Sequence, residues 1–186
     1  MSQNKLNSNT LIVCAGEMES FEFAKAVGIG MIEPAINLTK ILLNSKKLPK
    51  KIIFIGSCGI YGNENLLKIY QSSLAFNYEI SGIMGLSYTP IKINLPNVSQ
   101  KTILINSSNF ITNSAEISKK FKNLGFTAEN MEAYSIKCVA LEFGIEFESI
   151  LCATNYCDEN AHENFMQNYP KAKEIITKYL KSKGII

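Results

Sequence analysis

The sequence contains no arginine, and its only histidine is His162. Lysine therefore supplies all 19 basic residues against 16 acidic ones, which leaves a net charge of only +3 at pH 7. Nucleic-acid binding calls for an arginine-rich face with interleaved aromatic residues, which this chain lacks. A lysine cluster at 46–51 lies between two predicted core elements and is interpreted as a solvated turn. We therefore expect no nucleic-acid partner.

Long apolar runs are also missing. No run approaches the roughly 18 apolar residues of a membrane-spanning helix. Residues 1–10 are polar and rich in Asn and Ser, unlike the basic start and apolar core of a secretory signal. We expect a cytoplasmic protein without a membrane partner.

The cysteines lack the pattern of a disulfide framework or of a zinc site. They are odd in number, form no C-x-x-C pair and have one histidine to join them. We interpret them as reduced and mostly buried, and we expect no metal and no organic cofactor. These residues are Cys14, Cys58, Cys138, Cys152 and Cys157.

What the sequence does contain is short apolar runs alternating with helical patterns. Its 186 residues suit one domain, 10–186, after a loose arm at 1–9. Strands are expected at 10–16, 21–27, 51–55, within 66–92, at 102–105 and at 147–153. Helices are expected from Gly30 to about Asn44, at 114–124, at 131–143 and at 161–183, the last broken near Pro170. The first two strands form a hairpin in this prediction, and the alternation predicts an α/β domain with a mostly parallel sheet.

Polar residues follow three of the predicted strands, at 56–62, 106–111 and 153–158. Ligands of parallel sheets bind at the carboxyl ends of the strands, so these segments are candidates for a site. Gly56-Ser57-Cys58-Gly59 could offer backbone N–H groups and a hydroxyl to an anion, or form a plain tight turn. Thr154–Asp158 is either a dense set of ligand-binding groups or an ordinary polar loop.

Two single residues extend this candidate site. Glu132 begins a predicted helix on the same face as Ile136 and Val139, so its carboxylate could accept hydrogen bonds from a ribose diol in the crevice. It could equally lie at the edge, stabilised by the helix dipole. Phe110 could stack on a base or be a core residue.

The order and spacing of five segments resemble the nucleoside phosphorylase superfamily, which includes purine nucleoside phosphorylases, uridine phosphorylases and methylthioadenosine/S-adenosylhomocysteine nucleosidases. The segments are Gly28-Ile29-Gly30, Gly56-Ser57-Cys58-Gly59, Ser108-Asn109-Phe110-Ile111, Asn130-Met131-Glu132-Ala133 and Thr154-Asn155-Tyr156-Cys157-Asp158. The resemblance covers roughly residues 10–165. It implies a three-layer α-β-α sandwich with a mixed, mostly parallel sheet, a purine nucleoside as the small-molecule substrate, and a homo-oligomer.

The resemblance also implies roles for individual residues. Cleavage of the N-glycosidic bond would depend on Glu132 at the ribose and on Asn155 and Asp158 near the base. Residues in contact with the substrate would be Gly30, Gly56, Ser57, Phe110, Ile111 and Met131. Inorganic phosphate is a conceivable co-substrate.

Departures from the family pattern leave alternatives open. No arginine can clamp phosphate with its planar fork, which favours water or weakly bound phosphate. Asn155 replaces the usual Asp and cannot donate a proton as an acid, although Asp158 or His162 could. A similar Thr-Asn pair in trimeric purine phosphorylases favours 6-oxopurines, but an amide also matches adenine.

Two questions about the whole chain also stay open. If the first two strands form a hairpin, the family's first β-α unit is missing. If 10–19 is instead the family's first strand, Glu19 matches the water-activating glutamate of the nucleosidases. The alternative to an enzyme is a catalytically lapsed nucleoside-binding or structural protein on the same fold.

Overall fold

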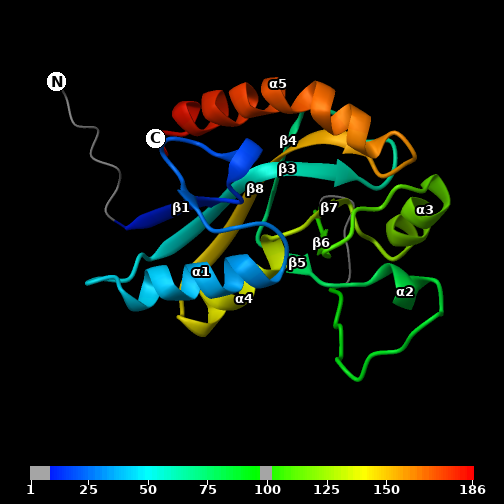
Figure 1. Ribbon diagram of the computed structural model, residues 1–186, viewed down its shortest axis with the longest axis horizontal. Helices are drawn as coiled ribbons and strands as arrows, with labels where there is room; N and C mark the ends of the chain where they lie inside the picture. Colours follow the sequence, from blue (N-terminus) through cyan, green and yellow to red (C-terminus); the bar gives the residue numbers. More distant parts are fainter. Residues whose placement is uncertain (1–8, 97–101) are drawn as a thin grey trace.

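Two long parallel strands lie at the centre of an eight-stranded sheet in the computed structural model, which describes residues 9–96 and 102–186 (Figure 1). The strand β3 (Lys51–Ile60) pairs with β8 (Glu146–Tyr156) from Lys51 opposite Glu146 to Ile60 opposite Tyr156. Most of their residues are buried, as is typical of parallel strands covered on both faces. The expected arm at 1–9, apart from Asn9, and residues 97–99 of the expected loop at 94–99 fall outside the described residues.

The remaining strands extend the sheet on both sides. On one side, β1 (Thr10–Cys14) is parallel to β3, and β2 (Lys25–Ala26) is parallel to β1. On the other, β4 (Ile69–Ser72) is antiparallel to β8. At the carboxyl end of β3, the antiparallel β7 (Ala128–Asn130) leads through β6 (Ile105–Ser107) to β5 (Ala75–Phe76). The sheet is therefore mixed and mostly parallel, as predicted.

Helices cover both faces of this sheet (Figure 1). The long helix α5 (Ala161–Ser182) packs on one face, while α1 (Ile32–Leu43) and α4 (Ala133–Glu142) pack together on the other. The short α2 (Ile80–Ile83) and α3 (Ala115–Asn123) lie beside the β5–β7 end. This is the expected three-layer α-β-α sandwich. Among the described residues, no helix is long and apolar enough to cross a membrane.

Alternation along β3 divides the core between the two helical layers. Ile52 and Phe54 belong to the cluster that packs under α1 and α4, whereas Ile53 and Ile55 face α5. Both clusters consist of residues that are almost fully buried, which explains why the KIIFI run is apolar on successive residues.

The predicted hairpin of the first two strands is wrong. Residues 17–19 form a short 3-10 turn, η1 (Glu17–Glu19), and only Lys25–Ala26 pairs, in the parallel sense. The alternation in FEFAKAV arises because Phe21 packs towards α5 while Val27 packs towards α1, rather than from a continuous strand. With β1 parallel to β3, the topology fits the alternative in which 10–19 is the first strand.

Other boundaries also differ from the prediction. Gly56–Gly59 and Thr154–Tyr156 are not loops, because β3 and β8 stay paired through them, with one irregularity in register after Cys58. Helix α5 continues through Pro170 without a break. Pro170 is exposed, so the carbonyl that loses its N–H partner there can be hydrated.

Candidate functional site

A cavity of about 430 Å³ opens at the carboxyl ends of the parallel strands β1, β3 and β8. This is the edge at which parallel sheets bind ligands, and the volume is typical of small-molecule sites. Its wall is formed by the residues after β1, the end of β3, segment 110–113, the β7–α4 junction and the start of α5.

Most of the residues singled out from the sequence line this cavity. They are Glu19, Ser57, Phe110, Ile111, Met131, Glu132, Asn155 and His162. Three others do not. Gly56 and Gly30 lie behind the wall, and the Asp158 carboxylate accepts a hydrogen bond of 2.9 Å from the Asn160 backbone N–H, ahead of α5.

Glu132 occupies the position before the first turn of α4, and its side chain is 2% exposed. Its Oε1 accepts a hydrogen bond of 3.0 Å from the Gly30 N–H, and its Oε2 accepts one of 2.7 Å from Asn130 Nδ2. Burial raises the pKa of the Glu132 carboxyl to about 7, and the negative charge of Glu19 contributes to this rise. The carboxylate is thus fixed in place with a proton affinity near neutrality.

The glycine-containing turn before α1 holds Glu132 through the hydrogen bond from the Gly30 N–H. Gly30 has a φ of +81°, and a Cβ there would lie 2.8 Å from Asn109 Oδ1. That same Asn109 oxygen accepts a hydrogen bond of 2.8 Å from the Met31 N–H. Only glycine meets both the backbone conformation and the close approach, so Gly30 contributes through its N–H and its small size.

Glu19 enters the cavity from η1, on the side of β3. Its Oε1 accepts a hydrogen bond of 2.7 Å from the Ser57 N–H. A Cβ at Gly56 would lie 3.5 Å from this oxygen, in ordinary van der Waals contact. Burial raises the pKa of Glu19, which brings this carboxyl closer to the range of a general base.

Asn155 reaches the cavity from the last residues of β8. Its Oδ1 accepts a hydrogen bond of 2.8 Å from Thr154 Oγ1, and its Nδ2 donates one of 3.0 Å to the Tyr156 carbonyl. An amide nitrogen carries two hydrogens. One hydrogen of Asn155 Nδ2 is therefore left to donate to a ligand.

Besides Glu17, the wall contains a further carboxyl that sequence reasoning missed, that of Glu129. It is 6% exposed and accepts hydrogen bonds from Thr112 and from the Tyr61 hydroxyl. Burial raises the pKa of this carboxyl as well. Residues 128–130 were not predicted as a strand, and the one available signal was an acidic residue directly before the Asn130–Ala133 motif.

The rest of the wall is largely apolar. Phe110 and Ile111 are 74% and 55% exposed, and Met18, Met131 and Phe165 also contribute. Of the described residues, none that lines the cavity is a lysine, and His162 is the single lining side chain that can carry a positive charge. The site therefore combines four carboxyls, three side-chain amides and apolar side chains suited to a neutral, partly aromatic ligand.

Comparison with known proteins gives a family match and several structural neighbours. Residues 92–182 match the phosphorylase superfamily. No curated protein matches the chain.

The structural neighbours are similar over most of their length. A mutant of the methylthioadenosine/S-adenosylhomocysteine nucleosidase of Helicobacter pylori, with 5′-methylthioadenosine in its active site, has 16% identity and a TM-score of 0.76, covering 95% of this chain and 97% of that one. A mutant of the futalosine hydrolase of the same organism also has 16% identity, with a TM-score of 0.75 over 93% and 96%. A putative nucleosidase from Borrelia burgdorferi bound to adenine has 19% identity and a TM-score of 0.71 over 92% and 97%.

At these identities the structural neighbours establish the fold of the chain. Residues 92–182 of this chain are therefore similar to the phosphorylase superfamily, and the chain as a whole shares the fold of the nucleosidases and the hydrolase compared above.

Proposed function

We propose that this chain is a purine nucleosidase, which cleaves the N-glycosidic bond of a purine nucleoside with water rather than with phosphate. The observation that carries the proposal is that Glu19 and Glu132 line one cavity into which no described lysine projects. The sequence has no arginine that could supply the missing cation.

A phosphate nucleophile is disfavoured by this arrangement. An anion placed between two carboxylates is repelled by both unless cations or free N–H groups compensate. The Ser57 N–H, a candidate phosphate donor by its position, already donates to Glu19 at 2.7 Å. A neutral water molecule faces no such repulsion, and a carboxylate can accept its proton.

Glu19 suits the role of general base in hydrolysis. The C1′–N9 bond breaks through an oxocarbenium-like state, and its electron pair leaves with the base. A water oxygen then bonds to C1′, Glu19 takes one proton from that water, and the departing base takes a proton from solvent. The products are a free purine and a ribose, so the step needs no other reactant.

The other wall residues hold the substrate in this scheme. Glu132 accepts hydrogen bonds from the ribose hydroxyls, opposite the charge that develops on the sugar ring. The spare N–H of Asn155 donates to the base, at N7 of any purine and at O6 of a 6-oxopurine. Phe110 packs on a ring face. The carboxylates also disfavour nucleotides, because a 5′-phosphate would add charge of the same sign.

The structural neighbours support hydrolysis by their names, since they are nucleosidases and a hydrolase. They are similar to this chain in fold, and the choice between water and phosphate is a matter for experiment. Adenine-type and 6-oxopurine nucleosides both remain within the proposal.

The test is chromatographic detection of free base from inosine, guanosine, adenosine and methylthioadenosine, each with and without phosphate. Release that does not depend on phosphate, and that falls in Glu19→Gln, supports the proposal. Release only with phosphate would make the protein a phosphorylase. No release from any nucleoside would favour a lapsed nucleoside-binding or structural protein.

A further inference from the structure

The wall of the cavity includes a segment, 108–113, that follows β6 and carries Phe110 and Ile111. Residues 109–111 and 113 are exposed, whereas Ser108 and Thr112 are buried, at 5% and 1% exposure. A segment with so little buried surface depends on the hydrogen bonds that hold its buried residues.

Thr112 directs both of its donors to one carboxyl. Its backbone N–H donates to Glu129 Oε1 at 2.8 Å, and its Oγ1 donates to Glu129 Oε2 at 2.8 Å. Hydrogen bonds to a charged acceptor are roughly twice as strong as neutral ones. Glu129 therefore anchors the segment on the far side of Phe110 and Ile111, while Ser108 donates to Glu79 and Asn109 accepts from the Met31 N–H at its start.

The Glu129 carboxyl is itself held from the end of β3. The Tyr61 hydroxyl donates to Oε2 at 2.5 Å and accepts a hydrogen bond of 3.3 Å from Asn106 Nδ2. The Tyr61 ring is fully buried and stacks on Phe121 with 4.7 Å between ring centroids. The Cys157 thiol, after β8, is a further donor. One carboxyl thus joins the segments that follow β3, β6 and β8.

Glu129 also lies beside Asn155 in the cavity wall. A Cβ placed on Gly59 would lie 3.0 Å from Asn155 Nδ2 and 3.4 Å from Glu129 Cγ. The anchor of segment 108–113 and the amide that faces the base are therefore neighbours on the same side of Gly59. No ion pair to Glu129 is found among the described residues, so its hydrogen-bond donors alone stabilise it.

We propose that Glu129 is a positioning residue for the purine base, which acts by holding Phe110 and Ile111 in the wall next to Asn155. The inference rests on the proposed function, because it assumes that a base occupies this end of the cavity. Glu129 contacts neither the glycosidic bond nor the ribose in this scheme. Its loss therefore affects binding of the base and leaves the chemical step almost unchanged.

Glu129→Gln tests this role. The amide keeps the size of the carboxyl but replaces one acceptor oxygen with a donor nitrogen, so one of the Thr112 or Tyr61 donors loses its partner. We expect the KM for the nucleoside to rise about tenfold while kcat changes less than about threefold. The Kd of the free base, adenine or hypoxanthine, measured by calorimetry, should rise by the same factor, and the Kd of ribose should not change.

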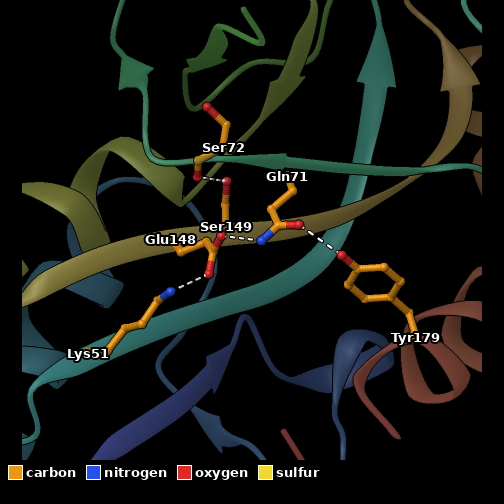
Figure 2. Close-up of polar contacts among 6 residues, drawn as sticks. All are labelled: Lys51, Gln71, Ser72, Glu148, Ser149 and Tyr179. Atoms are coloured by element: carbon orange, nitrogen blue, oxygen red, sulfur yellow. Dashed lines mark hydrogen bonds and ion pairs between the residues drawn. The ribbon is translucent and has the colours of Figure 1, made fainter. Parts of the chain in front are cut away.

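Glu148→Gln is the matched control. Glu148 is a partly buried carboxylate on β8 that pairs with Lys51 at 2.6 Å and accepts a hydrogen bond from Gln71, away from the cavity (Figure 2). The same chemical change there should leave KM and both Kd values unchanged. A second pair of variants covers the case in which Glu129→Gln folds poorly. Thr112→Val, which removes the hydroxyl donor, should weaken base binding, and Thr112→Ser, which keeps it, should restore it.

Three results would overturn the proposal. The base Kd could be unchanged in Glu129→Gln and Thr112→Val, or base and ribose affinities could fall together, as a loss of folded protein would cause. The third is a wild-type protein that binds no free base, which would overturn the proposed function as well. Base binding without release of base from nucleosides would contradict the nucleosidase alone, and the Kd comparison would still decide the role of Glu129.

Discussion

Replacing Glu132 by glutamine should stabilise the fold at pH 8 and destabilise it at pH 4.5. The carboxyl has its pKa raised from 4.5 to about 7, mainly by burial. A raised carboxyl pKa means that the unfolded chain releases this proton first. The folded state is therefore penalised as the pH rises from about 4.5 to 7, and the penalty is complete above pH 7.

The size of the effect follows from the two pKa values. Each tenfold change in proton affinity corresponds to about 1.4 kcal/mol, so ionising Glu132 costs the fold about 3 kcal/mol at pH 8 and less than about 0.5 kcal/mol at pH 4.5. Glutamine escapes this penalty at both pH values. It also loses a hydrogen bond, because either Gly30 N–H or Asn130 Nδ2 then faces an amide nitrogen, at a cost of about 1 kcal/mol.

Asn130 cannot rotate to repair that loss. Its Oδ1 already accepts hydrogen bonds of 2.7 Å from the backbone N–H groups of Glu132 and Ala133. The net change in unfolding free energy is therefore about +2 kcal/mol at pH 8 and about −1 kcal/mol at pH 4.5.

Denaturant unfolding of both proteins at the two pH values measures this difference. A difference that keeps one sign and size at both pH values would refute the reasoning, because it would show that Glu132 does not titrate between pH 4.5 and 7.

In the same variant the rate of base release should fall about 100-fold, since the amide cannot accept hydrogen bonds from both ribose hydroxyls as a carboxylate does.

Other substitutions separate the roles of the remaining wall residues. Glu19→Gln should lower kcat by about 100-fold or more and leave KM within a few fold in steady-state base release, since it removes the acceptor of the water proton; an unchanged kcat would exclude Glu19 as the base. Gly30→Ala should lower the unfolding free energy, measured in denaturant titrations, by about 2 kcal/mol. The reasons are the φ of +81° and the 2.8 Å between the added Cβ and Asn109 Oδ1, and wild-type stability would mean that the turn relaxes. Phe110→Ala should change the unfolding free energy by less than about 0.5 kcal/mol, as the ring is 74% exposed, yet raise the KM several-fold; an unaltered KM would remove Phe110 from the base site.

Local signals predicted much of the fold. The KIIFI run marked the central strand, and the helices expected to end at 124 and 143 do end there, beside Gly125 and Gly144, which both have positive φ. Ser114 was placed at the start of α3, and its Oγ accepts a hydrogen bond from the Ile117 N–H. These features depend on neighbours in sequence, so the sequence displays them.

Features that depend on distant partners were predicted less well. Alternation in FEFAKAV could not reveal that Phe21 and Val27 pack into different layers, because that depends on where α5 and α1 lie. Glu129 was missed for the same reason. Its partners Tyr61 and Thr112 lie in the segments after β3 and β6, and nothing beside Glu129 in sequence marks their convergence.

The neighbouring strand on one side of β3 changes from β1 to β7, and this change affects which substitutions the site can accommodate. On one side, β3 pairs with β1 up to Phe54 and with β7 only from Gly59 onward, so the ladder has a gap between them. Glu19 fills part of this gap by accepting the Ser57 N–H, as a neighbouring strand would. Between these two pairings the N–H that Glu19 accepts comes from the main chain, so this contact does not depend on which side chain occupies position 57. Slow deuterium exchange at the Ser57 backbone N–H would then report directly on whether Glu19 accepts this hydrogen bond.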